Sequence, residues 1–171
     1  MKNQPRIFVY PDRCLSCHSC ELACALAHSK TKSLAAAIYE KPRPQRRLFV
    51  EAGHEFKAPI HCRQCEDPPC VRVCPSGALL VAPSTLLVDY REQRCIGCFM
   101  CAMACPFGVI RSDAEDRFIV KCDYCAELET PACVTACPSR ALRFETEAEY
   151  ERGRRQRVSH LYWDQQPLGT R

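Results

Sequence analysis

The sixteen cysteines of this 171-residue chain fall into four quartets with closely related spacing. Two quartets have the spacing Cys-x2-Cys-x2-Cys-x3-Cys, and the other two lengthen only the middle gap, to four and seven residues. Proline follows the last cysteine in three of the four quartets. Thiolates at this spacing wrap iron–sulfur clusters, so we predict four [4Fe–4S] clusters. In chain order, quartet I is Cys14, Cys17, Cys20 and Cys24, quartet II is Cys62, Cys65, Cys70 and Cys74, quartet III is Cys95, Cys98, Cys101 and Cys105, and quartet IV is Cys122, Cys125, Cys133 and Cys137.

Disulfide bonds and zinc sites are the two other common uses of so many cysteines. Disulfide bonds belong to oxidising compartments, and residues 1–13 lack the apolar segment of a secretory signal. Zinc sites usually take two Cys-x2-Cys pairs on separate turns, and they have no use for the third and fourth cysteines of these quartets. Because thiolate clusters are oxidised readily, we expect a reducing, cytoplasmic location.

Charge and hydropathy argue against two further classes of protein. The formal net charge is +4. An oxidised cluster with its four thiolates carries about −2, so four clusters would bring the total to roughly −4. The chain has no aromatic stacking array or nucleic-acid recognition motif, and its longest apolar run, near residues 78–82, is far shorter than the roughly 18 residues of a membrane helix. We therefore expect no nucleic-acid partner and no direct membrane insertion.

The segments between the quartets indicate how the quartets pair. They could pair in sequence, I with II and III with IV, or in nested order, II with III and I with IV. Between quartets II and III, apolar runs at 78–81 and 86–89 are separated by turn residues, which predicts a hairpin that joins these quartets. Similar runs recur at 7–12, before quartet I, and at 141–144, after quartet IV. The nested pairing is therefore favoured.

These patterns predict an α+β fold. It would consist of two pseudo-symmetric bacterial ferredoxin-like halves, each with two [4Fe–4S] clusters, small antiparallel hairpins and short helices. The predicted organisation is a four-cluster core at residues 7–144, with half A at 62–105 and its flanks and half B at 7–24 plus 122–144, an insertion at 25–61, and a C-terminal helix and tail for partner docking at 145–171.

Within each half, three thiolates of one quartet and the last thiolate of the other are expected to share a cluster. One tight loop holds three cysteines around a corner of a cluster, while the fourth points toward the neighbouring cluster. Quartet I departs from the pattern because Cys24 is followed by Ala25 rather than proline, so a helix could continue there. The predicted ligands are Cys14, Cys17, Cys20 and Cys137 for cluster 1, Cys122, Cys125, Cys133 and Cys24 for cluster 2, Cys62, Cys65, Cys70 and Cys105 for cluster 3, and Cys95, Cys98, Cys101 and Cys74 for cluster 4.

Taken together, these segments resemble the four-cluster, ferredoxin-like electron-transfer subunits of complex oxidoreductases. The resemblance covers residues 7–144 and is most specific in Cys62-Arg-Gln-Cys65-Glu-Asp-Pro-Pro-Cys70 and Cys95-Ile-Gly-Cys98-Phe-Met-Cys101. Such subunits serve formate dehydrogenases, dimethyl sulfoxide reductase-type enzymes, hydrogenases, carbon monoxide dehydrogenases and aldehyde oxidoreductases. The resemblance implies the same nested pairing of quartets.

The resemblance also implies a function: passing low-potential electrons between a catalytic oxidoreductase subunit and a second redox protein or flavoprotein subunit. The catalytic partner is expected to be a tungsten- or molybdenum-pterin enzyme acting on an aldehyde or formate, with carbon monoxide dehydrogenase or hydrogenase next. No active site is expected in this chain, because its histidines have no paired nucleophile or base. His18 and His61, beside cysteines, could donate hydrogen bonds to sulfur. The alternative is a non-catalytic maturation or scaffold protein.

Two segments outside the quartets have their own patterns. In the insertion, residues 34–39 are predicted to be helical and residues 48–51 to form a strand, either covering the core or docking onto a catalytic subunit. At the C-terminus, Thr146 and Glu149 form a capping-box pattern. We expect a solvated helix of about three turns there, and then a loose tail, ending near residue 169, that carries Leu161, Tyr162 and Trp163. These side chains would fill a partner groove, support self-assembly or pack on their own domain.

Overall fold

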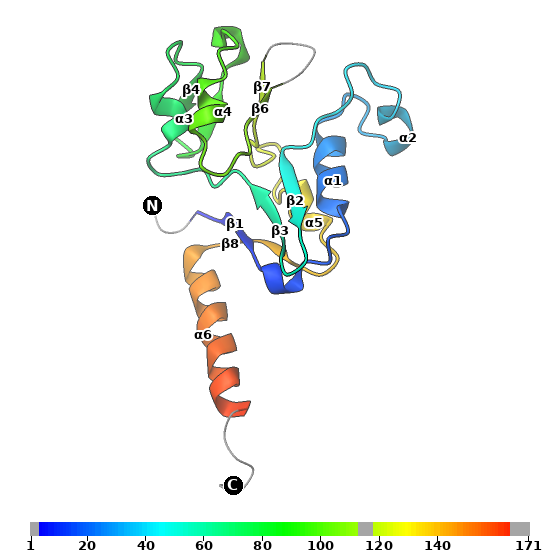
Figure 1. Cartoon of the computed structure of the whole chain (residues 1–171), viewed down its shortest axis with the longest axis vertical. Coiled ribbons are helices and arrows are strands. Elements are labelled where there is room, and N and C mark those ends of the chain that lie inside the picture. Colours follow the sequence, from blue (N-terminus) through cyan, green and yellow to red (C-terminus); the bar gives the residue numbers. More distant parts are fainter. Residues whose placement is uncertain (1–3, 113–117, 165–171) are drawn as a thin grey trace, which may run out of the picture.

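The computed structural model of the chain describes residues 4–112 and 118–164. Short helices and strands alternate along these residues (Figure 1). In chain order they are β1 Arg6–Val9, η1 Pro11–Arg13, α1 Ser19–Ala27, α2 Leu34–Ala37, β2 Leu48–Ala52, β3 Lys57–His61, α3 Pro69–Arg72, β4 Leu79–Val81, β5 Val88–Tyr90, η2 Glu92–Arg94, α4 Met100–Ala104, β6 Arg111–Ser112, β7 Ile119–Val120, α5 Ala132–Thr135, β8 Leu142–Glu145 and α6 Glu147–Asp164.

The strands form two-stranded antiparallel sheets, and one of them joins the two ends of the chain. In that sheet β1 pairs with β8, with Ile7 opposite Phe144 and Val9 opposite Leu142. The pairs β2–β3, β4–β5 and β6–β7 are hairpins between neighbours in sequence. The four strands predicted around the quartets are present as β1, β4, β5 and β8, and the described chain is a small mixed α/β fold with short antiparallel hairpins.

The insertion at 25–61 contains more regular structure than its sequence pattern indicates. The predicted helix is present only as α2, and the predicted strand is β2, which pairs with β3 along its full length. The strand β3 was not predicted, because Pro59 lies at its centre and proline is normally depleted in strands. Proline is tolerated here since a two-stranded sheet consists of edge strands only.

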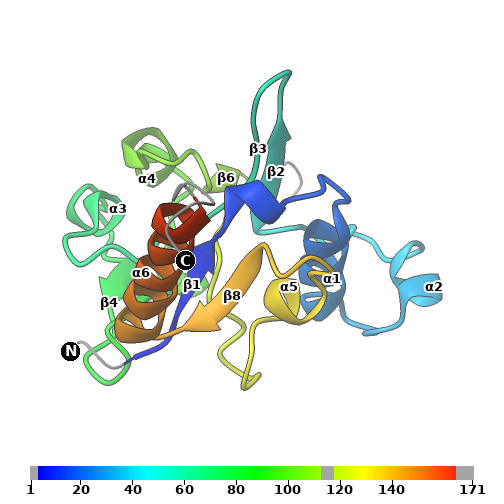
Figure 2. The same ribbon diagram turned by 90° about the horizontal axis from the view of Figure 1, so that it is seen from below.

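Buried apolar side chains gather in two clusters, and cysteines belong to both. The first cluster is built around Ile7, Leu48 and Leu142, and the second around Leu79 and Val88. Helix α1 contacts α5 beside the first cluster, whereas α3 contacts α4 beside the second, as Figure 2 shows. Each of these groups of buried side chains thus lies beside two helices that carry cysteines of different quartets.

The C-terminal helix α6 begins with the predicted capping box but extends further than expected. The Thr146 N–H donates to Glu149 Oε2 at 2.8 Å, and the Glu149 N–H donates to Thr146 Oγ1 at 3.3 Å. The prediction of a loose tail from Leu161 to Trp163 is wrong, because these residues lie in the last turns of α6. The reason is that residues 158–164 contain no glycine or proline to end the helix. The predicted end near residue 169 lies outside the described residues.

Helix α6 projects away from the body of the molecule and is anchored near its start (Figure 1). The Tyr150 ring stacks on Phe8 of β1, with ring centroids 4.2 Å apart. Further along, Arg157 pairs with Asp12 at 3.0 Å and covers the Tyr10 ring. No helix of the described residues is long and apolar enough to cross a membrane.

Candidate metal centres

All four quartets begin with a loop of the same backbone conformation. The residue directly before the second cysteine has a positive φ in each: Ser16, Gln64, Gly97 and Tyr124, at 53°, 48°, 68° and 61°. Residues other than glycine seldom adopt this left-handed conformation, so its recurrence indicates a common local constraint. Each Cys-x2-Cys segment thus turns at the residue before its second cysteine.

The exit from quartets II, III and IV is also shared. In each, the residue three positions after the last cysteine has a positive φ and donates its N–H to that cysteine's carbonyl oxygen: Gly77 at 3.3 Å, Gly108 at 3.2 Å and Arg140 at 3.2 Å. Quartet I lacks the proline that starts this turn. There α1 continues past Cys24 to Ala27, as its sequence indicates.

Two cavities are each lined by three cysteines of one quartet and one of another. Cys14, Cys17 and Cys20 of quartet I line one cavity together with Cys137 of quartet IV. The other cavity is lined by Cys95, Cys98 and Cys101 of quartet III together with Cys74 of quartet II. The first cavity thus combines cysteines of quartets I and IV, and the second combines cysteines of quartets II and III.

The remaining cysteines form two groups whose thiols affect one another's pKa. Burial raises the pKa of Cys65, and the neighbouring Cys62 and Cys105 raise it further. Burial likewise raises the pKa of Cys133, with further contributions from Cys122, Cys24, Cys125 and Cys20. The first group joins cysteines of quartets II and III, and the second joins cysteines of quartets IV and I.

The sulfur environment fits a thiolate-bound metal cluster. All sixteen cysteines are free, and closely spaced buried thiols ionise together only if a cation compensates their charge. Backbone N–H groups already point at sulfur: Ala141 donates to Cys137 Sγ at 3.2 Å and Arg47 donates to Cys24 Sγ at 3.3 Å. Four sulfur donors per site, supported by N–H donors, are the ligands of a [4Fe–4S] cluster.

Comparison with known proteins agrees with this chemistry. Residues 54–147, which include quartets II, III and IV, match the family described as "4Fe-4S dicluster domain". An "Iron-sulfur protein" of Rhodospirillum rubrum is 42% identical over 159 residues, covering 84% of this chain and 83% of that protein. The chain belongs to the ferredoxin-like iron–sulfur electron-transfer proteins.

Two further relatives are proteins of Escherichia coli, one of similar length and one much longer. "Electron transport protein HydN" of Escherichia coli K12 is 37% identical over 146 residues, covering 76% of this chain and 81% of HydN. "Putative oxidoreductase UacF" of the same strain is 39% identical over 132 residues; these cover 76% of this chain but only 19% of UacF, which is much longer. The ferredoxin-like protein described here is therefore an iron–sulfur electron-transport protein.

The histidine that contacts sulfur in the described residues is not one of the two predicted. His18 Nδ1 contacts Glu21 at 3.1 Å, and His61 Nδ1 contacts the Cys62 carbonyl oxygen at 2.7 Å. Instead, His28 Nδ1 lies 2.7 Å from the Cys24 carbonyl oxygen and 3.8 Å from Cys24 Sγ, and its Nε2 lies 3.2 Å from Asp123 Oδ1. The continuation of α1 explains the difference, because it places His28 one helical turn beyond Cys24.

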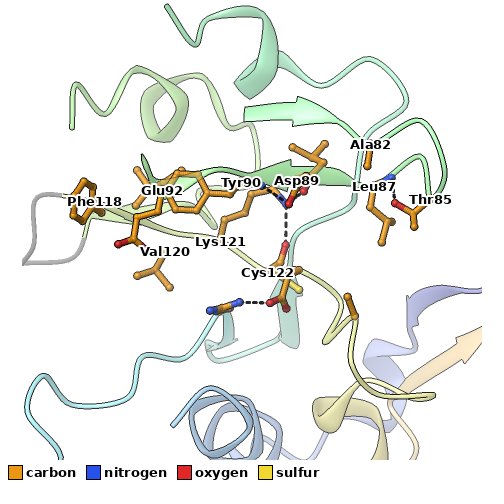
Figure 3. Close-up of a pocket in the computed structure, with 15 residues that line it drawn as sticks. Ala82, Thr85, Leu87, Asp89, Tyr90, Glu92, Phe118, Val120, Lys121 and Cys122 are labelled. Carbon is orange, nitrogen blue, oxygen red and sulfur yellow. Dashed lines mark hydrogen bonds and ion pairs between the residues drawn. The ribbon is translucent and has the colours of Figure 1, made fainter. Parts of the chain in front are cut away.

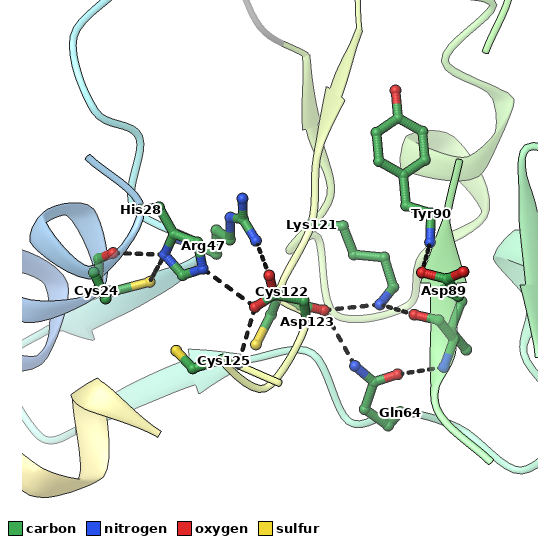
Figure 4. A network of polar contacts seen from close by, with 12 residues as sticks. Cys24, His28, Arg47, Gln64, Asp89, Tyr90, Lys121, Cys122, Asp123 and Cys125 are labelled. Carbon is green, nitrogen blue, oxygen red and sulfur yellow. Dashed lines mark hydrogen bonds and ion pairs between the residues drawn. The ribbon is translucent and has the colours of Figure 1, made fainter. Parts of the chain in front are cut away.

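Asp123, the partner of His28, has further contacts of its own. Asp123 also pairs with Arg47 at 2.5 Å and accepts a hydrogen bond from the Cys125 N–H at 2.9 Å (Figure 4). Although burial opposes ionisation of Asp123, hydrogen bonding to His28 and the Arg47 charge hold its pKa well below the usual range. His28, Asp123 and Cys125 could together approach one metal ion, but Cys125 already belongs to the predicted ligands of cluster 2.

Two further residues join the segments of quartets II, III and IV, and sequence analysis gave neither a role. Gln64 and Lys121 are both buried, and both bond to Val88 and to Cys122 (Figure 4). A hollow of about 460 Å³ opens beside them, lined by residues of β5 and of the 118–123 segment (Figure 3). Lys121 and Cys122 of quartet IV both line this hollow, so a basic side chain lies beside a cysteine of that quartet.

Proposed function

We propose that this protein conducts electrons along four [4Fe–4S] clusters, in the order cluster 1, cluster 2, cluster 3 and cluster 4. Each cluster, when bound, supplies a one-electron carrier. The polypeptide supplies the sulfur ligands, orders the sites and keeps water away from most of the thiolates. The ligand sets are those predicted from the sequence, with the quartets paired in nested order.

Electrostatic effects between thiols of different ligand sets support this order. Cys20 of cluster 1 raises the pKa of Cys133 of cluster 2, and Cys62 of cluster 3 raises the pKa of Cys122 of cluster 2. Between the last two clusters, Cys70 of cluster 3 raises the pKa of Cys101 of cluster 4. Each junction thus links consecutive members of the proposed series.

The observation that carries the proposal is the exposure of the cysteines. Cys17 and Cys98 are exposed, whereas the other fourteen are buried or partly buried. These two belong to clusters 1 and 4, the opposite ends of the series. Exposed apolar side chains adjoin both, Leu15 beside Cys17 and Ile96 beside Cys98. Electrons can therefore enter at one end and leave at the other, where a partner protein can exclude water.

The organisation that fits this series is two pseudo-symmetric halves. Half A, residues 62–105 with flanks, would hold clusters 3 and 4, and half B, residues 7–24 plus 122–144, would hold clusters 1 and 2. Equivalent hydrogen bonds support the symmetry, since Tyr10 N–H donates to the Ala141 carbonyl and Arg91 N–H to the Ala78 carbonyl, both at 2.8 Å. The insertion at 25–61 and α6 then lie outside the repeated unit and are available for docking.

The partners are a catalytic oxidoreductase subunit at one end and a second redox protein or flavoprotein at the other, in the cytoplasm. The relative UacF supports the first, because a segment similar to this chain occurs inside a longer protein named as an oxidoreductase. Within the family resemblance, a tungsten- or molybdenum-pterin enzyme for an aldehyde or formate comes first, then carbon monoxide dehydrogenase or hydrogenase. The chain itself would have no active site.

Potentiometric titration of anaerobic holoprotein, followed by electron paramagnetic resonance, tests the proposal. The wild type should hold four reversibly reducible clusters that couple magnetically in the reduced state. Cys125→Ala should remove cluster 2 and leave an uncoupled cluster 1 beside a coupled pair. The matched control, Cys98→Ala, removes a terminal cluster and should leave three coupled clusters. Clusters that cannot be reduced reversibly would favour a scaffold protein, and a coupled cluster 1 in Cys125→Ala would contradict the order.

A further inference from the structure

A lysine is buried where the segments of quartets II, III and IV meet. Lys121 is 5% exposed. Its Nζ donates hydrogen bonds of 2.8 Å to the Val88 carbonyl oxygen in β5 and of 2.8 Å to the Cys122 carbonyl oxygen, as Figure 4 shows. These bonds fix the ammonium group between a strand of half A and a cysteine of half B.

No carboxylate of residues 4–112 and 118–164 forms an ion pair with this ammonium group. Burying a charge is unfavourable unless an opposite charge lies nearby. The ammonium group lies beside predicted cluster ligands, whose thiolates would supply the opposite charge. Its hydrogen bond to the Cys122 carbonyl oxygen places it next to a predicted ligand of cluster 2. Gln64, which bonds to the same two residues as Lys121, lies between Cys62 and Cys65 of the predicted cluster 3.

We propose that Lys121 raises the reduction potentials of the two inner clusters and so sets the electron-transfer step across the middle of the protein. The inference rests on the proposed function. Reduction adds negative charge to a site, and a fixed neighbouring cation favours that charge, all the more where water is excluded. Lys121 acts on both inner sites because its hydrogen bonds hold it between them. In this role the Lys121 side chain acts through its positive charge and not as a metal ligand.

The matched controls are substitutions of Lys121 itself. Gln64 is 1% exposed and bridges the same two residues, with Nε2 donating to the Cys122 carbonyl oxygen at 3.1 Å and Oε1 accepting from the Val88 N–H at 2.8 Å, but it belongs to the Cys62–Cys65 loop. Lys121→Gln keeps N–H donors at the junction without the charge, and Lys121→Arg keeps the charge. A purely structural role for Lys121 would make these two variants equivalent, whereas an electrostatic role would separate them.

The test compares Lys121→Gln and Lys121→Arg with the wild type as anaerobic holoproteins, by potentiometric titration with electron paramagnetic resonance. In Lys121→Gln, the equilibrium constant for reduction of the two inner clusters should fall at least tenfold, a shift of about 59 mV for one electron. The two outer clusters should keep their potentials, and Lys121→Arg should keep the potentials of all four clusters.

Unchanged potentials in Lys121→Gln, or an equal shift in Lys121→Arg, would overturn the inference. If Lys121→Gln does not load its clusters, Lys121→Met removes the charge with an apolar side chain, and the same shift is expected there. The proposed function is tested by a different result, because it requires four reversibly reducible clusters in the wild type. Four such clusters without a shift in the Lys121 variants would leave the function in place and remove only the role of Lys121.

Discussion

Shortening one buried leucine in each half should destabilise different clusters. Leu142 of β8 and Leu79 of β4 follow quartets IV and II at the same distance, and they are 1% and 2% exposed. Each belongs to a different buried cluster of side chains. We predict that Leu142→Ala accelerates the loss of clusters 1 and 2, whereas Leu79→Ala accelerates the loss of clusters 3 and 4.

The size of the effect follows from the burial of both side chains. Truncating a fully buried leucine to alanine costs about 2 to 5 kcal/mol, because the transfer free energy is lost and a cavity remains. If opening of the affected half limits cluster release, this raises the release rate roughly 30- to 4,000-fold. Because the two leucines are buried to a similar extent, each variant serves as the control for the other.

The assay is iron release to a chelator in mild denaturant without oxygen, with electron paramagnetic resonance on samples taken during the reaction. Leu142→Ala should release about half of its iron rapidly and keep the coupled signal of clusters 3 and 4. The reasoning would be refuted if both variants released all four clusters at one rate, because the halves would then open as a single unit.

Two other predictions concern the ligands and the C-terminal helix. Replacing Cys137 with serine should damage the cluster held by Cys14, Cys17 and Cys20 and leave the signals of clusters 3 and 4 intact; loss of those signals instead would favour sequential pairing. Removing residues 147–171, which include no cysteine, should preserve iron content and reduce the size of the assembled complex in light scattering. Normal assembly, or loss of iron, would place α6 within the fold rather than at an interface.

The cysteine quartets can be recognised in the sequence because their spacing is local. The left-handed conformation that Ser16, Gln64, Gly97 and Tyr124 share was not predicted, because their side chains have nothing in common. The strands beside the quartets are predicted, since apolar runs bounded by turn residues define them. By contrast, β3 is missed because it depends on pairing with β2, which compensates for the unfavourable Pro59.

The surroundings of sulfur are harder to predict, because they depend on contacts between distant segments. In the sequence, nothing distinguishes Lys121 from other basic residues. Its buried position depends on a carbonyl acceptor in β5, 33 positions away in sequence. His28 could have been found by extending α1 beyond Cys24, since the absence of proline already suggested that extension. The contact of His28 with Asp123, 95 positions along the chain, has no comparable local signal.

Iron and acid-labile sulfide analysis of anaerobically prepared protein, with zinc measured in parallel, tests the central claim most directly. Four clusters require about 16 iron and 16 sulfide per chain. The family match by itself describes a dicluster domain, so the count separates four clusters from two. A value near 16 for both elements, with zinc absent, is the predicted result. About 8 iron per chain, or zinc in stoichiometric amount, would contradict the four-cluster account.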